Sequence, residues 1–434
     1  MRFIVSPGGE LRGELRVASD KSISHRAVLL SSLAHGTSEI SNILMSADVR
    51  ATIEAVRACG AKVEEKKGRL LVCGNGGLQS PATPIDCGNS GTLIRLFSGV
   101  AAGWQMGVTL TGDESLTSRP MRRIADPLSQ MGAEIQTSAA GTPPLIVAPN
   151  KPLRGTAHKI EIASAQVKSA LLLAGLRAEG ETSVSESLPT RDHTERMLEA
   201  FDAPLQRRDG TVVVQGGVKL SPARFGVPAD ISSAAFFMAG AAIAEGGDIV
   251  LSEVGINPTR IGMVELLRRM GASIEVLNPR QMGAEPVADI RVFGGNLKGI
   301  DIVAADVPAA IDEFPALFVA AAAAKGETRV SGAGELRHKE SDRLAGMIAG
   351  LRQMGVECEE TDDGAVIEGR NGKMFSGGEV DSRGDHRLAM AFAMAALRAK
   401  TPVIVQDCEN VATSFPDFAK QATCAGLRIA MEKV

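Results

Sequence analysis

The chain has 434 residues and a net charge of −4, with 44% apolar and 23% charged residues, which is typical of a globular protein of two or three domains. The negative net charge, one Trp and the absence of Tyr argue against nucleic acid as a partner. No apolar run is long enough to span a membrane, and the N-terminus lacks an apolar signal core. We therefore expect a cytoplasmic protein without a membrane partner.

The six cysteines and six histidines are scattered, with no Cys-x-x-Cys and no His-x-x-x-His spacing. Zinc ribbons, thioredoxin-like sites and zinc-protease motifs are therefore not indicated. We expect reduced, mostly buried thiols and no metal site.

The first distinctive element is a helix expected to begin at Asp20, in the segment Asp-Lys-Ser-Ile-Ser-His-Arg that ends at Arg26. Asp20 can cap the helix, and Ser22 and Arg26 lie four residues apart on one face. Lys21 would oppose the helix dipole unless an anion also binds there. The segment thus predicts a phosphate or carboxylate site, with an ordinary solvated helix start as the alternative.

This pattern recurs along the chain as a polar residue that opens an Ala/Leu-rich helix, followed by a helix end with a small-residue turn. Asp20 precedes Gly60 by 40 residues, and the five later spacings lie between 38 and 43. The openers are Asp20, Asn89, Ser164, Asp230, Asp312 and Asp385, and the turns lie at residues 60, 132, 202, 271, 355 and 425. Glycine at most of these turns supplies a left-handed helix stop.

Each repeat of about 70 residues is predicted to run strand, helix, strand, helix, strand, strand, which indicates an α/β fold. Six repeats suggest two domains of three, with a boundary near Phe225–Val227. The N-terminal segment Phe3–Val17 reads as one strand that could pair with either domain.

Polar clusters accompany the helix starts. Taken singly, Asn89, Ser164, Asp312 and Asp385 read as helix caps, and Arg119 before a proline reads as an exposed turn residue. Asn257–Arg260 also reads as structural.

Taken together, equivalent helices would direct several positive N-termini towards a cleft between the domains. Seven cations would collect there, namely Lys21, Arg26, Arg119, Arg191, Lys339, Arg343 and Arg387. They predict a small ligand with roughly two phosphates and two carboxylates, at nearly −2 per phosphate. Asp312 and Glu340 are the candidate acid–base groups among them.

At these residues the chain resembles the 5-enolpyruvylshikimate-3-phosphate synthase family over nearly its whole length. The motifs that carry the resemblance are residues 20–26, 88–92, 116–120, 163–168, 337–343, 385–387 and 413–416. The resemblance implies two domains of three βαβαββ units, residues 20–227 and residues 1–19 plus 228–434, hinged near Ser19 and Val227. It also implies transfer of an enolpyruvyl group from phosphoenolpyruvate to shikimate 3-phosphate, through a tetrahedral intermediate and without a cofactor or metal.

The resemblance also implies roles for individual residues. The residues expected to bind shikimate 3-phosphate are Lys21, Ser22, Arg26, Ser164, Ala165, Gln166, Arg191, Asp312 and Lys339. Those expected at phosphoenolpyruvate are Lys21, Asn89, Gly91, Arg119, Gln166, Arg343, His386, Arg387 and Thr413. Asp312 would take the proton of the attacking hydroxyl, Glu340 would exchange a proton with the methylene carbon, and Lys21 would assist at the bridging or leaving oxygen.

Three departures from the common pattern resemble the second major class of the family. Thr413 stands where some members carry Lys, no Tyr is available for the substrate ring, and Ala165 lies between Ser164 and Gln166. Gly91 leaves room for glyphosate, so we expect glyphosate to inhibit, and the resemblance suggests a monomer.

Two alternatives remain open at this point. A related enolpyruvyl transferase acts on UDP-N-acetylglucosamine, but its usual Cys is missing from residues 112–119. A non-catalytic repeat protein that binds a phosphorylated ligand is the second, and Asp312 and Glu340 among seven cations argue against it.

Overall fold

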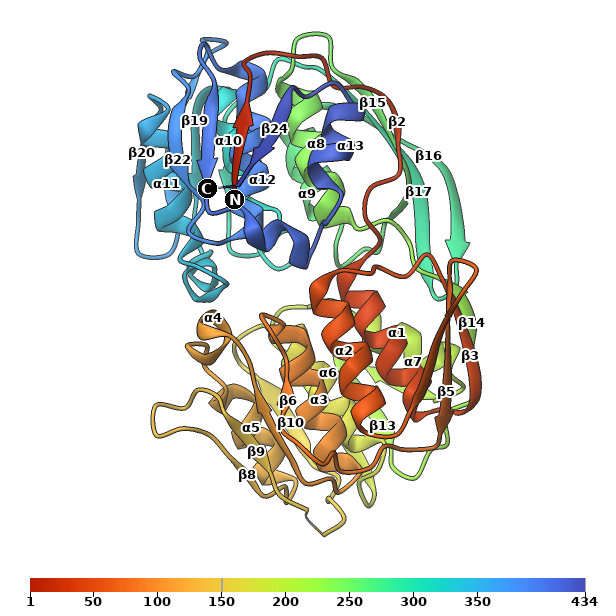
Figure 1. Cartoon of the computed structure of the whole chain (residues 1–434). Helices are drawn as coiled ribbons and strands as arrows, with labels where there is room; N and C mark the ends of the chain where they lie inside the picture. The colour runs from red at the N-terminus through yellow and green to blue at the C-terminus, as the bar shows by residue number, and fades with distance from the viewer. Residues whose placement is uncertain (150, 434) are drawn as a thin grey trace. The chain divides into compact units, whose positions relative to one another are not determined.

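The computed structural model describes residues 1–149 and 151–433. Residue contacts divide the chain into two compact units. Unit 2 comprises Ser19–Val227 and the short segment Gln281–Glu285, and unit 1 comprises Met1–Ala18, Pro228–Arg280 and Pro286–Val434. Each unit is described by itself, with its elements labelled as in Figure 1.

Among the described residues, six four-stranded sheets share one strand order. In each, the first strand runs parallel to the second, the fourth pairs antiparallel with the second, and the third pairs antiparallel with the fourth, as in β10-β11-β13-β12. The predicted α/β fold of βαβαββ repeats is therefore confirmed.

Unit 2 contains repeats I to III. Repeat I consists of β14 (Arg224–Gly226), α1 (Lys21–Leu33), β3 (His35–Ser41), α2 (Ala47–Ala58), β4 (Lys62–Lys66) and β5 (Arg69–Asn75). Repeat II consists of β6 (Ile85–Asp86), α3 (Gly91–Gly103), β7 (Val108–Thr111), α4 (Glu114–Thr117), α5 (Arg122–Gln130), β8 (Ile135–Gln136) and β9 (Leu145–Val147). Repeat III consists of β10 (Ala157–Ile160), α6 (Ala165–Gly175), β11 (Glu181–Glu186), α7 (His193–Ala200), β12 (Leu205–Arg208) and β13 (Thr211–Gln215).

Unit 1 contains repeats IV to VI. Repeat IV consists of β2 (Arg12–Leu15), α8 (Ile231–Ile243), β15 (Asp248–Gly255), α9 (Gly262–Arg269), β16 (Ser273–Met282) and β17 (Glu285–Phe293). Repeat V consists of β18 (Asp301–Ile302), α10 (Phe314–Ala323), β19 (Lys325–Val330), the 3₁₀ turn η1 (Gly334–His338), α11 (Arg343–Gln353), β20 (Glu357–Glu360) and β21 (Ala365–Arg370). Repeat VI consists of β22 (Gly378–Asp381), α12 (His386–Ala395), η2 (Ala396–Arg398), β23 (Val403–Gln406), η3 (Glu409–Thr413), α13 (Phe418–Cys424), β24 (Ile429–Glu432) and β1 (Arg2–Val5).

Three strands complete sheets from which they are distant in sequence. The prediction of one strand over Phe3–Val17 is wrong, because this segment forms β1 and β2 in two different sheets. β1 pairs with β23 and β24, and β2 pairs with β15, so both belong to unit 1. In unit 2, β14 pairs with β3 and completes repeat I. Local sequence does not distinguish these sheets, because any short alternating strand can complete an open edge.

The helix starts follow the predicted pattern with two corrections. Side chains of Asp20, Ser164, Asp230 and Asp385 accept hydrogen bonds from backbone N–H groups of their helices' first turns. Asn89 and Asp312 are not caps, however, because α3 is capped by Ser90 and α10 begins after Glu313. Each of these two residues therefore lies one position outside its helix start, where its side chain can reach other groups.

The six helix-ending turns all contain a residue with positive φ, at Gly60, Gly132, Asp202, Gly271, Gly355 and Gly426. The last of these lies one residue after the predicted position 425. Helices α8 and α10 are buried on nearly every side, which explains why their sequences are apolar all round. In unit 1, α8, α10 and α12 pack against one another, and hydrogen bonds from Ser232 to Glu313 and from Arg387 to the Asp312 carbonyl join their N-terminal ends.

Candidate active site

In unit 2, side chains join the starts of α1, α3 and α6. His25 of α1 lies 3.4 Å from the hydroxyl of Ser90, the cap of α3. Arg26 of α1 donates to Ser169 of α6 at 2.8 Å. Gln166 of α6 donates to Thr92 of α3 at 3.1 Å. These bonds bring three helix N-termini together at one end of the unit, where they favour an anion.

Arg26 is held rigidly at this end. Its guanidinium donates to Thr194 Oγ1 at 2.7 Å and to the carbonyl of Ser22 at 2.9 Å, in addition to Ser169. The pKa of Arg26 is lowered to about 10, chiefly by burial; Glu195 and Asp20 oppose this shift, and Arg191 adds to it. The side chain remains a cation near pH 7.

Lys21 and His25 flank this arginine. The Lys21 ammonium lies 2.9 Å from Asp48, in the first turn of α2, and its side chain is 15% exposed. His25 is buried with Nδ1 2.6 Å from Thr52 Oγ1, and burial, with Lys21 and Arg26, lowers its pKa well below the usual value. His25 is thus a neutral orienting group. Asp48 was missed in the sequence, where it looks like an ordinary acidic residue of a helix start.

A second cationic group surrounds the start of α3. Arg119 is buried and donates to Asn89 Oδ1 at 2.8 Å, while the Asn89 amide donates to Asp113 at 2.8 Å. A Cβ on Gly91 would lie 3.0 Å from Arg119 Nη1. The structure therefore brings together three residues that the sequence predicted for phosphoenolpyruvate.

Arg95 was not predicted. It donates to Gln166 Oε1 at 2.7 Å, and its Nη1 would lie 2.9 Å from a Cβ on Gly91. The available signal was a single arginine inside the otherwise apolar helix α3. Such a buried charge requires polar partners, and Gln166 provides one.

The start of α6 and the segment before α7 provide the remaining predicted residues of unit 2. Ser164 caps α6, and the carbonyl of Ala165 accepts from Ser169 at 2.6 Å. Arg191 is half-buried, one residue after Thr190. Thr190 is anchored to Glu186, which with Glu195 surrounds Lys168 at 2.7 and 2.8 Å. Although burial opposes its charge, these two carboxylates raise the pKa of Lys168, so Lys168 is a structural cation.

In unit 1, one buried arginine joins the predicted carboxylates. Arg343 is 1% exposed and donates to Asp385 at 2.8 Å, to Asp312 at 3.2 Å and to Glu340. Burial opposes its charge, but Asp385, Glu340 and Asp312 raise the pKa of Arg343. The guanidinium therefore holds the two candidate acid–base groups at fixed positions around one cation.

Asp312 is surrounded by cations from three segments. Its Oδ1 lies 3.6 Å from Lys339 Nζ and 3.2 Å from Arg343, and its Oδ2 lies 3.9 Å from Arg387. Arg387 also donates to the Asp312 carbonyl at 2.9 Å. The one-residue shift of the α10 start therefore leaves Asp312 outside the helix, in contact with three predicted cations.

His386 and Thr413 complete the predicted set. His386 is buried in the first turn of α12. Thr413 ends η3, and its hydroxyl donates to the carbonyl of Asn410 at 2.7 Å, while Asn410 donates to the carbonyl of Gly384 at 2.8 Å. Thr413 is thereby linked through Asn410 to the residue before Asp385.

The start of α8 has a different character. Arg260 is buried and donates to Ser232 at 2.7 Å, with Asp230 at 3.4 Å and Glu313 at 3.5 Å. Ser232 also donates to Glu313. This internal network agrees with the structural interpretation of Asn257–Arg260. It lies at the start of α8 in repeat IV, the position that corresponds to Lys21 and Ser22 at the start of α1 in repeat I.

Within residues 1–149 and 151–433, no group of three or more His, Cys, Asp or Glu side chains is placed to hold a metal ion. No helix in the same residues combines the length and the apolar composition that a membrane span requires.

The fold and these two sets of side chains define a class of enzyme, built from two three-repeat α/β units, that handles a small and highly anionic substrate. The family model for EPSP synthase (3-phosphoshikimate 1-carboxyvinyltransferase) matches residues 5–421. The chain belongs to this family.

Known relatives match over almost the whole chain. The 3-phosphoshikimate 1-carboxyvinyltransferase of Methylococcus capsulatus is 56% identical over 98% of both chains. That of Legionella pneumophila is 50% identical over 99% of both chains. A solved structure of the EPSP synthase from Acinetobacter baumannii superposes with a TM-score of 0.89 and 48% identity, over 100% of both chains.

Proposed function

We propose that the chain transfers the enolpyruvyl group of phosphoenolpyruvate to the 5-hydroxyl of shikimate 3-phosphate and releases phosphate. Its family membership makes it a transferase of the shikimate pathway, which serves aromatic amino acid biosynthesis. The matched family and relatives favour this acceptor over the UDP-sugar. The observation that carries the proposal is the position of Arg343, which joins Asp312 and Glu340.

The unit 2 residues are assigned to binding. Ser22, Arg26, Ser164, Ala165, Gln166 and Arg191 bind shikimate 3-phosphate, and Asn89, Gly91, Arg119 and Gln166 bind phosphoenolpyruvate. The rigid placement of Arg26 and Arg119 supports this, because a preorganised fork binds phosphate or carboxylate with little further loss of side-chain entropy. Lys21 contacts both substrates.

The unit 1 residues are assigned to proton transfer and to charge at the reacting group. Asp312 accepts the proton of the attacking hydroxyl, and Glu340 protonates the methylene carbon and then removes a proton as phosphate leaves. Lys339 contacts shikimate 3-phosphate, and Arg343, Arg387, His386 and Thr413 face phosphoenolpyruvate. Asp312 lies among three cations and Glu340 accepts from Arg343, so each carboxylate is held by positive charge in a position to exchange protons.

Three further points belong to the proposal. Glyphosate competes with phosphoenolpyruvate for its binding residues, and the protein acts as a cytoplasmic monomer. Its two domains are residues 20–227 and residues 1–19 plus 228–434.

The test of the reaction is phosphate release from phosphoenolpyruvate with and without shikimate 3-phosphate. Release that requires shikimate 3-phosphate supports the proposal. Release that instead requires UDP-N-acetylglucosamine overturns it.

A further inference from the structure

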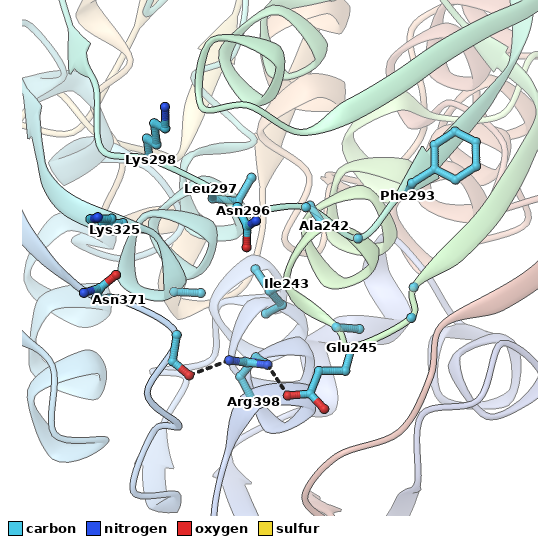
Figure 2. Close-up of a pocket in the computed structure, with 17 residues that line it drawn as sticks. Ala242, Ile243, Glu245, Phe293, Asn296, Leu297, Lys298, Lys325, Asn371 and Arg398 are labelled. Atoms are coloured by element: carbon cyan, nitrogen blue, oxygen red, sulfur yellow. Dashed lines mark hydrogen bonds and ion pairs between the residues drawn. The ribbon is translucent and has the colours of Figure 1, made fainter.

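A pocket of about 760 Å³ lies in unit 1 at the C-terminal ends of α8 and α10. Ile243 of α8 and Arg398 of η2 contribute to its wall (Figure 2). Ala323 of α10 also lines it. α8 has 13 residues, so about 20 Å of helix separates this pocket from Asp230 at the opposite end. It is therefore distinct from the carboxylates and cations at the helix starts.

Two lysines of the pocket are neighbours. Lys298 and Lys325 are backbone partners in an isolated parallel β-bridge, and both line the pocket. Both side chains are exposed, and among the described residues no ion pair involves either of them. Like charges placed directly opposite each other are destabilising, and an anion between them would remove the repulsion.

The equivalent bridge in unit 2 carries opposite charges. Arg154 pairs there with Glu179. The two bridges have matching backbone bonds, since the N–H of Arg154 donates to Met131 at 2.9 Å and the N–H of Lys298 donates to Met270 at 2.8 Å. The backbone geometry of the bridge therefore does not require two lysines, because the matching bridge in unit 2 carries an arginine and a glutamate.

The same end of the helices in unit 2 is also covered by an aromatic side chain. Trp104 follows α3, donates to the carbonyl of Gly76 at 3.0 Å and lies under the guanidinium of Arg177 at 5.7 Å. The pocket of unit 1 instead contains Gly246, Gly247, Gly294, Gly295 and Gly372 among its lining residues. Small residues leave the space open where unit 2 fills it.

The remaining charges also favour an anion. Arg398 donates to Glu245 at 2.8 Å and to the carbonyl of Gly372 at 2.6 Å, as Figure 2 shows. The Glu245 side chain is 90% exposed, so a ligand anion can displace it from Arg398 at small cost. Lys298, Lys325 and Arg398 are positive, Glu245 is negative, and the C-termini of α8 and α10 add about half a negative charge each. The net charge of the pocket is therefore positive.

We propose that this pocket binds a small organic anion, a carboxylate or phosphate ester with an apolar body. The anionic group lies between Lys298 and Lys325, and the apolar body lies against Ile243 and Leu297, which line the pocket with Ala242 and Ala323. No covalent step is involved.

The test is calorimetric titration of the full chain with phenyl phosphate and, separately, with benzoate and inorganic phosphate. The variant Lys325→Glu reproduces the charge pattern of Arg154 and Glu179, so it should fold at least as stably as the wild type. The control Lys420→Glu makes the same charge change at an exposed position of α13, outside the pocket. We expect at least tenfold weaker binding to Lys325→Glu at the pocket and unchanged binding to Lys420→Glu.

The three probes separate the parts of the proposal. Tighter binding of phenyl phosphate than of benzoate would identify a phosphate ester as the ligand. Tighter binding of benzoate would identify a carboxylate. Inorganic phosphate binding as tightly as both overturns the apolar contact. Equal affinity of every probe for the wild type, Lys325→Glu and Lys420→Glu overturns the site, because all binding would then occur elsewhere.

Discussion

The helix starts of the two units are built from the same repeat, but their buried arginines contact different groups. In unit 2, Arg26 and Arg119 donate to neutral oxygens of Thr194 and Asn89. In unit 1, Arg343 donates to the three carboxylates of Asp385, Asp312 and Glu340. An arginine that is hydrogen-bonded to neutral oxygens keeps more of its attraction for a ligand anion, whereas an arginine that is bonded to carboxylates holds acid–base groups in place. We therefore expect unit 2 to contribute mainly to substrate binding, and unit 1 to add the proton-transfer groups to its own binding residues.

The largest expected effect falls on a carboxylate of unit 1. Glu340→Gln retains an oxygen for Arg343 but cannot exchange a proton, so we expect kcat to fall by about 10³, within the range of general acid–base catalysis. Phosphate release measures it, with exposed Glu359→Gln as the matched control. A Glu340→Gln rate near that of the wild type would remove Glu340 from the catalytic residues, provided that the far-UV spectrum shows a folded protein.

The buried network of Arg260, Asp230 and Glu313 at the start of α8 should stabilise the folded protein. Arg260→Met leaves Asp230 and Glu313 buried without their cation, and we expect a loss of about 3–5 kcal/mol in the free energy of unfolding. The control Arg269→Met breaks a more exposed pair with Asp306, 2.8 Å long, and should cost at most about 1 kcal/mol. Urea denaturation gives both values, and similar losses in the two variants would contradict the difference.

The binding role of unit 2 predicts an effect on affinity. Arg26→Gln removes a fixed guanidinium from the start of α1, so the KM for shikimate 3-phosphate should rise by about 10- to 100-fold, as for loss of a charged hydrogen bond. We expect a smaller change in kcat. Steady-state kinetics would contradict the comparison if kcat fell strongly while KM stayed the same, because Arg26 would then act in the transition state.

Gly91 tests the space around the cations of repeat II. A Cβ there would lie 2.9 Å from Arg95 Nη1 and 3.0 Å from Arg119 Nη1, so both flexible arginine ends must shift. We expect Gly91→Ala to raise the KM for phosphoenolpyruvate a few-fold and to weaken glyphosate inhibition more strongly. In the control Gly334→Ala the nearest atom is 3.7 Å away, and inhibition should not change. Unaltered inhibition of Gly91→Ala would show that glyphosate does not use this space.

The smallest effect concerns pH. The lowered pKa of buried His25 means that the unfolded state binds this proton more readily, so stability is lost as the pH falls below about 6.5. Between pH 6.5 and 5.5, His25 should account for a loss of about 1 kcal/mol in the free energy of unfolding. His25→Gln removes this contribution, which urea denaturation at both pH values can measure. An unchanged pH slope in His25→Gln would mean that other groups, such as His158, account for the loss.

Local patterns predicted most of the helix starts and turns because these depend on a few adjacent residues. Asp20, Ser164, Asp230 and Asp385 cap helices as expected. The starts at Asn89 and Asp312 were each one residue off, because Ser90 caps α3 locally and because Glu313, which precedes α10, accepts from Ser232 of α8. Arg95 was missed because its partner Gln166 is 71 residues away, which no local pattern reveals.

The sequence by itself determined the repeat, the α/β class and the residues that carry the family resemblance, because periodicity, caps and turns act over short distances. Only the tertiary structure decided which sheets β1, β2 and β14 complete, because an open sheet edge accepts any suitable strand. It also decided the partner of each cation. A neutral oxygen or a carboxylate beside an arginine changes its electrostatics, and that neighbour is set by packing between segments that are far apart in the chain.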